Sequence, residues 1–229
     1  DQAYSQLLTE VHAIGKEVLA AHAQDVDSKA RFPQESIDAI KALKLMSAFV
    51  PKDFGGLGYD VKQISKICEI LARYCGSTAM IFSMHQIQVC CIVHHSLESE
   101  YYQSYVKSLV EEQRLIASAT TEIGTGGDLL ASFCAVEAVD GEFKIFKRAP
   151  VISYGEYADD IILTARRNAD AANSDQVHIL LNKSQYTLKP ISGWDTLGFR
   201  GTCSAGFDLE GSGRVEQICP TPFPVVLSQ

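Results

Sequence analysis

Extended basic clusters are missing from this sequence. Lysine and arginine stand side by side in pairs only, at Lys147-Arg148 and Arg166-Arg167, and the net charge of the 229 residues is −8. Nucleic acids and anionic membranes are bound through basic surfaces, so neither is an expected partner. The N-terminus also lacks the basic stretch and apolar core of a signal peptide, which argues against secretion.

Metal-binding and hydrolase signatures are missing as well. The seven cysteines include no Cys-x-x-Cys pair, and most fall in apolar runs, as expected for reduced core thiols of a cytoplasmic protein. Cys90/His94 and Cys91/His95 are each separated by one helical turn, but no third ligand accompanies them, so we expect no metal site. The absence of a Gly-x-Ser-x-Gly sequence disfavours a serine hydrolase.

Helical periodicity runs through residues 1–112. Leu7, Val11, Ile14 and Val18 recur at steps of three and four, which predicts a first amphipathic helix. A second helix is expected to begin at Pro33, and further helices over 60–75, 79–93 and 99–110. Asp60 and Gln63 have the spacing of a reciprocal N-terminal cap. The 79–93 stretch is apolar nearly all round but shorter than a bilayer span, so we expect it at the centre of a bundle.

From Leu115 onward the hydrophobic period changes to two. Short strands are expected around 143–145, 161–164, 177–181, 186–188 and 205–209, with Asp140-Gly141 as a tight hairpin turn. Regular short strands of this kind predict a β-barrel or sandwich. The sequence therefore predicts an α+β protein with an N-terminal helical domain, residues 1–112, and a β domain, residues 113–229.

The segment 117–128, Ala-Ser-Ala-Thr-Thr-Glu-Ile-Gly-Thr-Gly-Gly-Asp, joins an apolar strand to a glycine-rich turn. A turn of this kind leaves backbone N–H groups free to bind a phosphate or the polar edge of a flavin. A second interpretation is that the glycines are present only because the turn requires positive φ angles.

Four segments in order carry a family resemblance: 49–58 (Phe-Val-Pro-Lys-Asp-Phe-Gly-Gly-Leu-Gly), 74–79 (Tyr-Cys-Gly-Ser-Thr-Ala), 121–128 and 197–202 (Leu-Gly-Phe-Arg-Gly-Thr). Together they resemble successive signatures of the acyl-CoA dehydrogenase family, from about Phe32 onward. The resemblance implies an FAD cofactor and a helical domain followed by a β domain. It also implies a C-terminal helical domain, which would begin where this sequence stops.

The resemblance assigns cofactor-binding roles to Thr120, Thr121, Gly126 and Gly127. The two threonines take the places that present backbone and a hydroxyl to the pyrimidine side of the flavin. Ordinary β propensity is the alternative interpretation of two adjacent threonines. Gly127 replaces a serine that helps to bind the FAD phosphate, so backbone donation is kept and a hydroxyl is lost.

A second flavin-contacting segment of the family corresponds to residues 147–155. There Val151 replaces the tryptophan that packs against the flavin, whereas Ser153 keeps a hydroxyl where a threonine normally binds near the reactive ring nitrogen. The same residues are compatible with a strand-ending turn that has no role in binding. Trp194 is interpreted as an aromatic that fills core or interface volume.

No catalytic residue is assigned. The resemblance places the glutamate base in the C-terminal helical domain, and Glu122 belongs to the cofactor-side motif. The implied reaction is the α,β-desaturation of an acyl thioester of coenzyme A or of an acyl carrier protein, with an electron-accepting flavoprotein as a further partner. A homo-oligomer is implied too, and this chain alone is expected to be inactive.

Two alternatives stay open. The first is a flavin-dependent monooxygenase-like protein, which needs no glutamate base and is suggested by the Val151 segment. The second is a non-catalytic descendant that binds an acyl thioester or a partner protein, suggested by Gly127, Val151 and the missing base.

Overall fold

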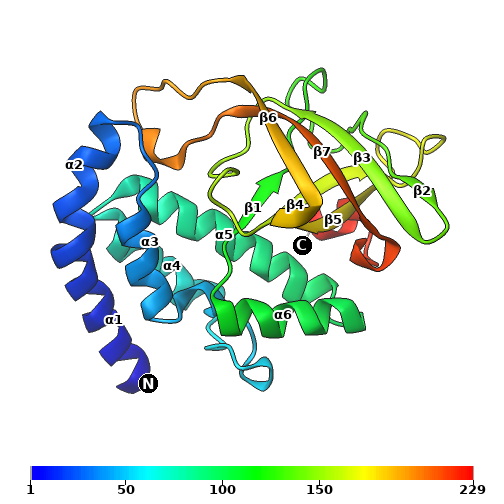
Figure 1. Ribbon diagram of the computed structural model, residues 1–229. Helices are drawn as coiled ribbons and strands as arrows, with labels where there is room; N and C mark the ends of the chain where they lie inside the picture. Colours follow the sequence, from blue (N-terminus) through cyan, green and yellow to red (C-terminus); the bar gives the residue numbers. More distant parts are fainter. Residues whose placement is uncertain (1, 229) are drawn as a thin grey trace.

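The structure, a computed structural model, describes residues 2–228, and its N-terminal half is helical (Figure 1). The helices are α1 (Gln2–Ile14), α2 (Ala20–Ser28), α3 (Gln34–Ala42), α4 (Val61–Ala72), α5 (Gly76–His95) and α6 (Glu100–Glu112), with 3-10 turns at Leu45–Ser47 and Lys52–Phe54. A π-helical segment, Gly15–Leu19, joins α1 to α2. The expected first helix is thus one long helix with a π-bulge.

The π-bulge lies beside Tyr74, two residues beyond the end of α4. A side-chain carbon at Gly15 would lie 2.3 Å from Cδ2 of Tyr74, and the Tyr74 hydroxyl lies 3.1 Å from Nδ1 of His12. Glycine is therefore required by the close approach of the tyrosine ring and not by an unusual φ angle. Downstream, Asp60 and Gln63 form the predicted reciprocal cap of α4, with backbone-to-side-chain distances of 2.8 and 3.1 Å.

Helix α5 is the central helix of the fold. It is longer than its predicted stretch, and by length and composition it could cross a membrane. Within the fold more than half of its most apolar window is buried between the other helices and the strands, which accounts for its apolar composition. Figure 1 shows it running between α4, α6 and the sheets.

The second half consists of two sheets, with 3-10 turns at Lys183–Gln185, Arg200–Thr202 and Val215–Gln217. One sheet has the order β1-β4-β5, from Ile116–Ala119, Asp160–Arg166 and Gln176–Asn182. The other has the order β2-β3-β7-β6, from Glu137–Val139, Glu142–Ala149, Gly206–Arg214 and Tyr186–Ser192. Asp140 and Gly141 both have positive φ between β2 and β3, as the predicted hairpin turn requires.

The three-stranded sheet lies between the four-stranded sheet and the helices. Strands β4 and β5 are buried on both faces, whereas β3 alternates strictly between exposed and buried residues. One face of β4–β5 therefore packs on the other sheet and the opposite face on α5 and α6. Residues 2–228 contain two sheets of this kind and no closed barrel, so the sandwich alternative describes the fold and the barrel does not.

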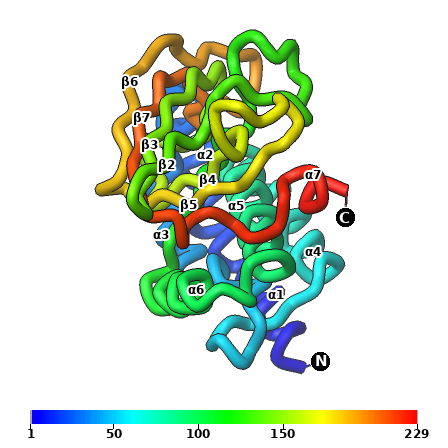
Figure 2. Tube along the Cα trace, turned by 90° about the vertical axis from the view of Figure 1, so that its right-hand side faces the viewer, coloured from blue at the N-terminus to red at the C-terminus, as the bar shows by residue number. Residues whose placement is uncertain are grey.

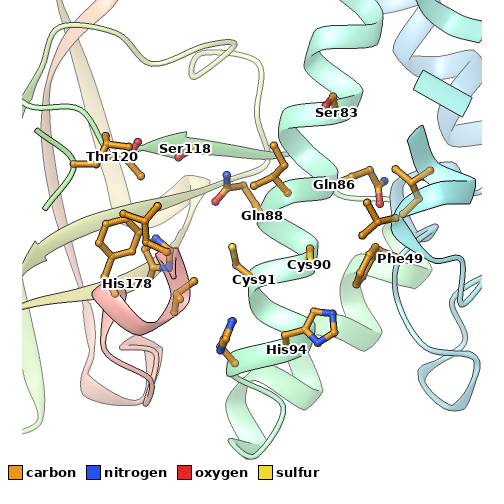
Figure 3. Close-up of a pocket in the computed structure, with 18 of the residues that line it drawn as sticks. Phe49, Ser83, Gln86, Gln88, Cys90, Cys91, His94, Ser118, Thr120 and His178 are labelled. Carbon is orange, nitrogen blue, oxygen red and sulfur yellow. The ribbon is translucent and has the colours of Figure 1, made fainter. Parts of the chain in front are cut away.

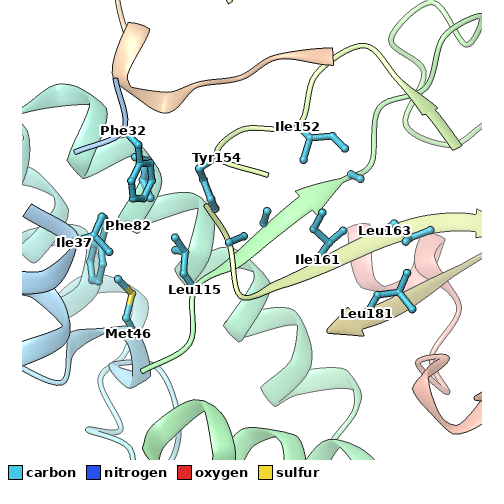
Figure 4. Close-up of a cluster of buried hydrophobic side chains, with 14 of the residues drawn as sticks. Phe32, Ile37, Met46, Phe82, Leu115, Ile152, Tyr154, Ile161, Leu163 and Leu181 are labelled. Carbon is cyan, nitrogen blue, oxygen red and sulfur yellow. The ribbon is translucent and has the colours of Figure 1, made fainter. Parts of the chain in front are cut away.

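A continuous hydrophobic core joins the helices to the strands (Figure 4). Phe82 of α5, Leu115 and Tyr154 belong to one cluster of buried residues with Ile161 and Leu181 of the sheet. The last helix ends at Glu112 and the first strand begins at Ile116, close to the predicted boundary. The division into two domains itself stays a prediction.

The C-terminal segment returns to the helical half. After a bridge between Ile179 and Ile218, the backbone N–H of Cys219 donates to the His178 carbonyl at 2.8 Å, and the short helix α7 (Phe223–Leu227) follows. Figure 2 shows α7 beside α5 and above α4. This return places α7 on the wall of a cavity.

Candidate functional site

A cavity with a volume of about 710 Å³ lies between α5 and the three-stranded sheet (Figure 3). Its walls come from α4, from one side of α5, from β1, from β5 and from α7. The lining is mostly apolar, with residues such as Phe49, Ile64, Ile87, Phe223 and Val226. A space of this size and character suits a small ligand or an apolar chain.

The sheet contributes polar groups to the cavity wall. Ser118 and Thr120 follow each other at a spacing of two along and just beyond β1, so their side chains share one face, and both line the cavity with His178 of β5. Thr164 lies between Thr120 and His178: it pairs with His178 in the β4–β5 ladder, and its hydroxyl donates to the Thr120 carbonyl at 3.3 Å. The cavity therefore extends to the end of β1.

The two predicted flavin segments meet at that same end. The Thr121 hydroxyl donates to the Val151 carbonyl at 3.2 Å, and the Ile123 N–H donates to the Arg148 carbonyl at 2.9 Å. Thr120 and Thr121 are separated by this arrangement, because Thr120 lines the cavity whereas Thr121 contacts the 150–155 segment. Sequence alone grouped them on one ligand edge.

The glycine turn that follows is open to solvent. Gly126 and Gly127 have φ angles of 65° and 90°, and a side-chain carbon built on either would meet no atom within 4 Å. No backbone hydrogen bond within residues 2–228 uses the N–H of either glycine. Because φ near 90° is strained for any other residue, the glycine that replaces the family's serine at 127 matches the conformation of the turn.

A buried ion pair fixes the base of the turn. Glu122 accepts hydrogen bonds from the Ser132 hydroxyl at 2.7 Å and from the N–H groups of Phe133 and Cys134 at 3.1 and 2.8 Å. Lys147 is fully buried, lies 3.6 Å from the Glu122 carboxylate, and donates to the Thr164 carbonyl at 2.7 Å. Glu122 thus has a structural role at the base of the turn.

Ser153 lies in a chain of hydroxyl groups inside the protein. Its Oγ is 2.8 Å from Oγ of Ser204, which is 2.7 Å from the Thr202 hydroxyl, and Ser153 is buried. Val151, two residues earlier, is exposed. In this conformation the serine hydroxyl is engaged within the protein, and the role that the resemblance gives it stays a prediction.

Comparisons with known proteins agree with this architecture. Residues 1–113 match the family described as acyl-CoA dehydrogenase, N-terminal domain. Isovaleryl-CoA dehydrogenase of Oryza sativa subsp. japonica is 24% identical over 218 residues, which cover 91% of this chain and 52% of that protein. The chain belongs to the acyl-CoA dehydrogenase family. It spans about half the length of the curated relatives that it matches.

Solved structures support the same acyl-CoA dehydrogenase fold. Butyryl-CoA dehydrogenase from Megasphaera elsdenii aligns with a TM-score of 0.82 and 22% identity, covering 97% of this chain and 59% of that one. FMN-bound TdsC from Paenibacillus sp. A11-2, a dibenzothiophene monooxygenase, aligns with a TM-score of 0.85 and 19% identity, covering 97% and 56%. The family fold thus includes both dehydrogenases and monooxygenases.

The residues of this acyl-CoA dehydrogenase family member fit a flavin at one end of the cavity. The free N–H groups of Gly126 and Gly127 suit a phosphate. Thr120 lines the cavity, and the Thr121 hydroxyl, which donates to the Val151 carbonyl, keeps oxygen lone pairs that can accept from a polar ring edge. Trp194, offered as a core or interface residue, is only half-buried, and its indole N–H donates to the Phe199 carbonyl at 3.0 Å. Within residues 2–228 no group of three or more His, Cys, Asp or Glu side chains could hold a metal ion.

His85 and His178 are both buried. The sequence favours a core or interface position with satisfied hydrogen bonds for His85, and it assigns His178 no role. His85 of α5 lies within hydrogen-bond reach of the Met46 carbonyl and the Ile116 N–H, and burial lowers its pKa to about 4. Burial, followed by the nearby charges of Lys147 and His95, lowers the pKa of His178 to about 4 as well. Both side chains are neutral at pH 7, so each can accept a hydrogen bond.

These pKa values make the stability of the fold depend on pH. In the unfolded state both imidazoles have a pKa of 6.5, so they bind protons more readily there than in the folded state. The free energy of unfolding is therefore highest above pH 6.5 and falls as the pH decreases toward 4. At pH 5 we expect each histidine to reduce the free energy of unfolding by about 2 kcal/mol relative to pH 7.5. Urea unfolding at the two pH values measures the difference.

The control for this pH prediction is the variant His85→Gln. Its loss of unfolding free energy between pH 7.5 and pH 5 is expected to be about 2 kcal/mol smaller than that of the unchanged protein. An identical pH dependence in the two proteins would show that the pKa of His85 is not lowered in the folded state.

Proposed function

We propose that this chain forms the flavin- and acyl-contacting part of an FAD-dependent oxidoreductase that catalyses the α,β-desaturation of an acyl thioester. The observation that carries the proposal is the course of the cavity. It lies against the apolar side of α5 and is lined by Thr120, next to the hydrogen bond between Thr121 and Val151. An apolar chain inside it would therefore lead to the place where the flavin-side residues converge.

Each part of the site has a defined task in this proposal. The cavity binds the acyl chain and excludes water, the two threonines orient the ring edge of the cofactor, and the N–H groups of Gly126 and Gly127 bind its phosphate. The flavin, when bound, supplies the redox chemistry. No residue of this chain is assigned the removal of the α-proton.

The partners belong to the same proposal. The acyl carrier is coenzyme A or an acyl carrier protein, and electrons pass to a second flavoprotein. We place the complete protein in the cytoplasm as a homo-oligomer. The names of relatives such as isovaleryl-CoA dehydrogenase and butyryl-CoA dehydrogenase support an acyl-CoA as the first substrate to test.

A second candidate is a flavin-dependent monooxygenase, in which reduced flavin reacts with oxygen. It is supported by the fold similarity to TdsC and by the exposed Val151, which offers no aromatic surface to a ring. A carboxylate base is not needed in this candidate, which is compatible with our assigning that role to no residue of this chain.

The test is the visible flavin spectrum of purified protein, measured on this chain and on the product of its complete gene after incubation with FAD or FMN and desalting. We expect retained flavin, bleached by isovaleryl-CoA or butyryl-CoA without oxygen in the complete product. Retained flavin that no acyl-CoA bleaches, but that consumes oxygen once reduced, would favour the monooxygenase. If neither polypeptide retains flavin, both flavin-dependent candidates are overturned, and a non-catalytic binding protein remains.

Thr121 provides a mutational check of the same site. Replacing it by valine keeps the side-chain shape and removes the hydroxyl, so flavin affinity is expected to fall about tenfold, the equivalent of one hydrogen bond. Fluorescence titration with FAD measures the change. Thr187→Val on the exposed side of β6 is the matched control and is expected to bind flavin unchanged. Equal affinities of the two variants would remove Thr121 from the binding site.

A further inference from the structure

The cavity wall includes a glutamine that no other part of the described chain engages. Gln88 of α5 is 8% exposed and lines the cavity, and within residues 2–228 its side-chain amide forms no hydrogen bond. Neither amide atom is fully enclosed by protein, and Figure 3 shows the amide extending from α5 into the space beside the strands. A glutamine buried to this degree ordinarily has hydrogen-bond partners, so a ligand in the cavity is the partner to look for.

Gln86, two residues earlier on the same helix, shows the usual arrangement. Its amide nitrogen donates to the Leu45 carbonyl at 2.8 Å and to the Met46 carbonyl at 3.3 Å. Positions 86 and 88 are about 200° apart around a helix, so the two amides leave α5 on opposite sides (Figure 3). The Gln86 amide therefore joins α5 to the turn at Leu45, whereas the Gln88 amide is left to the cavity.

Strand β1 adds two hydroxyl groups to the same wall. Ser118 and Thr120 line the cavity, and in the described chain neither side-chain hydroxyl forms a hydrogen bond. The strand starts at α5, where the Ile116 N–H donates to Nδ1 of His85 at 3.1 Å. Two residues of a strand span about 6.6 Å, so Ser118 lies nearer the helix and Thr120 farther from it (Figure 3). Gln88 and Ser118 thus lie on the helix side of Thr120.

The rest of the wall sets the charge of the group that Gln88 and Ser118 can bind. No lysine, arginine, aspartate or glutamate of the described chain lines the cavity, and its apolar lining includes Phe223 and Val226. An ionised group would lose its hydration there without gaining a counter-charge. A neutral carboxamide avoids this cost. It both donates and accepts, so it can form two parallel hydrogen bonds with the glutamine amide while the serine hydroxyl donates or accepts a third.

We propose that Gln88 and Ser118 form a polar subsite for a neutral hydrogen-bonding group, a carboxamide above all, on the acyl chain beyond its thioester. This inference rests on the proposed function, which places the flavin end of the cavity at Thr120, and it names the substrate class. A plain alkyl chain fits the apolar wall but leaves the Gln88 amide without a partner. The chain that bears a carboxamide supplies one, and this difference is the basis of selection.

The test uses hexanamide and needs neither flavin nor thioester. Calorimetry measures its dissociation constant for the unchanged chain, Gln88→Leu, Ser118→Ala and Gln34→Leu. Gln34 is exposed on α3 outside the cavity, so Gln34→Leu is the matched control. The affinity is expected to fall about tenfold in Gln88→Leu and about threefold in Ser118→Ala, and to stay unchanged in Gln34→Leu. Toluene, which has no hydrogen-bonding group, is titrated as well, and no variant is expected to bind it more weakly.

A spectroscopic readout locates the bound amide. The side-chain ¹H–¹⁵N signals of Gln88, assigned with Gln88→Leu, are expected to shift when hexanamide is added. No binding of hexanamide, or an equal affinity of Gln88→Leu and the unchanged chain, would overturn the inference. Displacement of hexanamide by FAD would also overturn it, because the subsite would then belong to the flavin. If Gln88→Leu no longer binds toluene, the affinity of Ser118→Ala decides in its place.

The outcomes separate this inference from the proposed function. If the chain retains flavin and the Gln88→Leu affinity for hexanamide is unchanged, the inference alone fails. If that affinity falls and neither this chain nor the product of its complete gene retains flavin, the proposed function alone fails.

Discussion

Replacing His85 by alanine is expected to lower the free energy of unfolding by about 3–4 kcal/mol. The imidazole joins three parts of the fold: it projects from α5, its Nε2 lies 2.8 Å from the Met46 carbonyl, and its Nδ1 lies 3.1 Å from the Ile116 N–H at the start of β1. A carbonyl only accepts and an N–H only donates, so the proton resides on Nε2. Both nitrogens of a fully buried ring are therefore satisfied.

The cost of His85→Ala has two parts. The Ile116 N–H loses its partner, at about 1–3 kcal/mol, whereas the Met46 carbonyl keeps the Gln86 amide at 3.3 Å. The space left by the ring adds a cavity term of similar size. Urea unfolding at pH 7.5 measures the sum.

His94→Ala is the matched control for this prediction. It removes the same side chain from the same helix at an exposed position, and it is expected to change the free energy of unfolding by less than about 0.5 kcal/mol. Similar losses in the two variants would mean that the hydrogen bonds of His85 contribute little, and that helix α5 responds to any truncation.

The role of His85 illustrates what sequence could and could not predict. The periodicity of the helices, the Asp60–Gln63 cap and the Asp140-Gly141 turn are local features, so they were predicted and are found. The partners of His85 lie 39 and 31 residues away in the chain. No local pattern contains such contacts, so the sequence favoured a satisfied core or interface histidine at position 85 but could not name its partners.

The candidate site shows the same division. The glycine turn and the two threonines came from a motif, but their separation across the strand depends on how β1 meets the 150–155 segment. Sequence analysis did not assign a role to His178 or Lys147, although the sequence contains a signal for Lys147. Phe143 and Ile145 alternate with exposed residues, and the same period directs Lys147 inward. A lysine at an inward strand position indicates a buried anionic or carbonyl partner.

Removing Glu122 is expected to destabilise the fold more than removing Lys147, although the two form one pair. Glu122→Ala deprives the Ser132 hydroxyl and the N–H groups of Phe133 and Cys134 of their acceptor and leaves the buried ammonium group without its counter-charge. We expect a loss of about 3–5 kcal/mol in the free energy of unfolding.

Lys147→Met leaves the carboxylate with all three of its hydrogen-bond donors, so its cost is expected to be about 1–2 kcal/mol. Burial already lowers the pKa of Lys147, against the opposing effect of Glu122, which means that the charged amine gains little from its position. The double variant Glu122→Gln with Lys147→Met should therefore be more stable than Glu122→Ala, because no buried ammonium group remains.

The neighbouring pair Arg148–Asp208 provides the control for the Glu122 and Lys147 variants. Its distance of 3.0 Å is shorter than the 3.6 Å of the buried pair, but Arg148 is exposed, so Arg148→Ala is expected to cost less than about 1 kcal/mol. Urea unfolding of all four variants measures these differences. A larger loss in Lys147→Met than in Glu122→Ala would mean that the lysine contacts with Thr164 and Thr120, and not the carboxylate, hold the glycine turn in place.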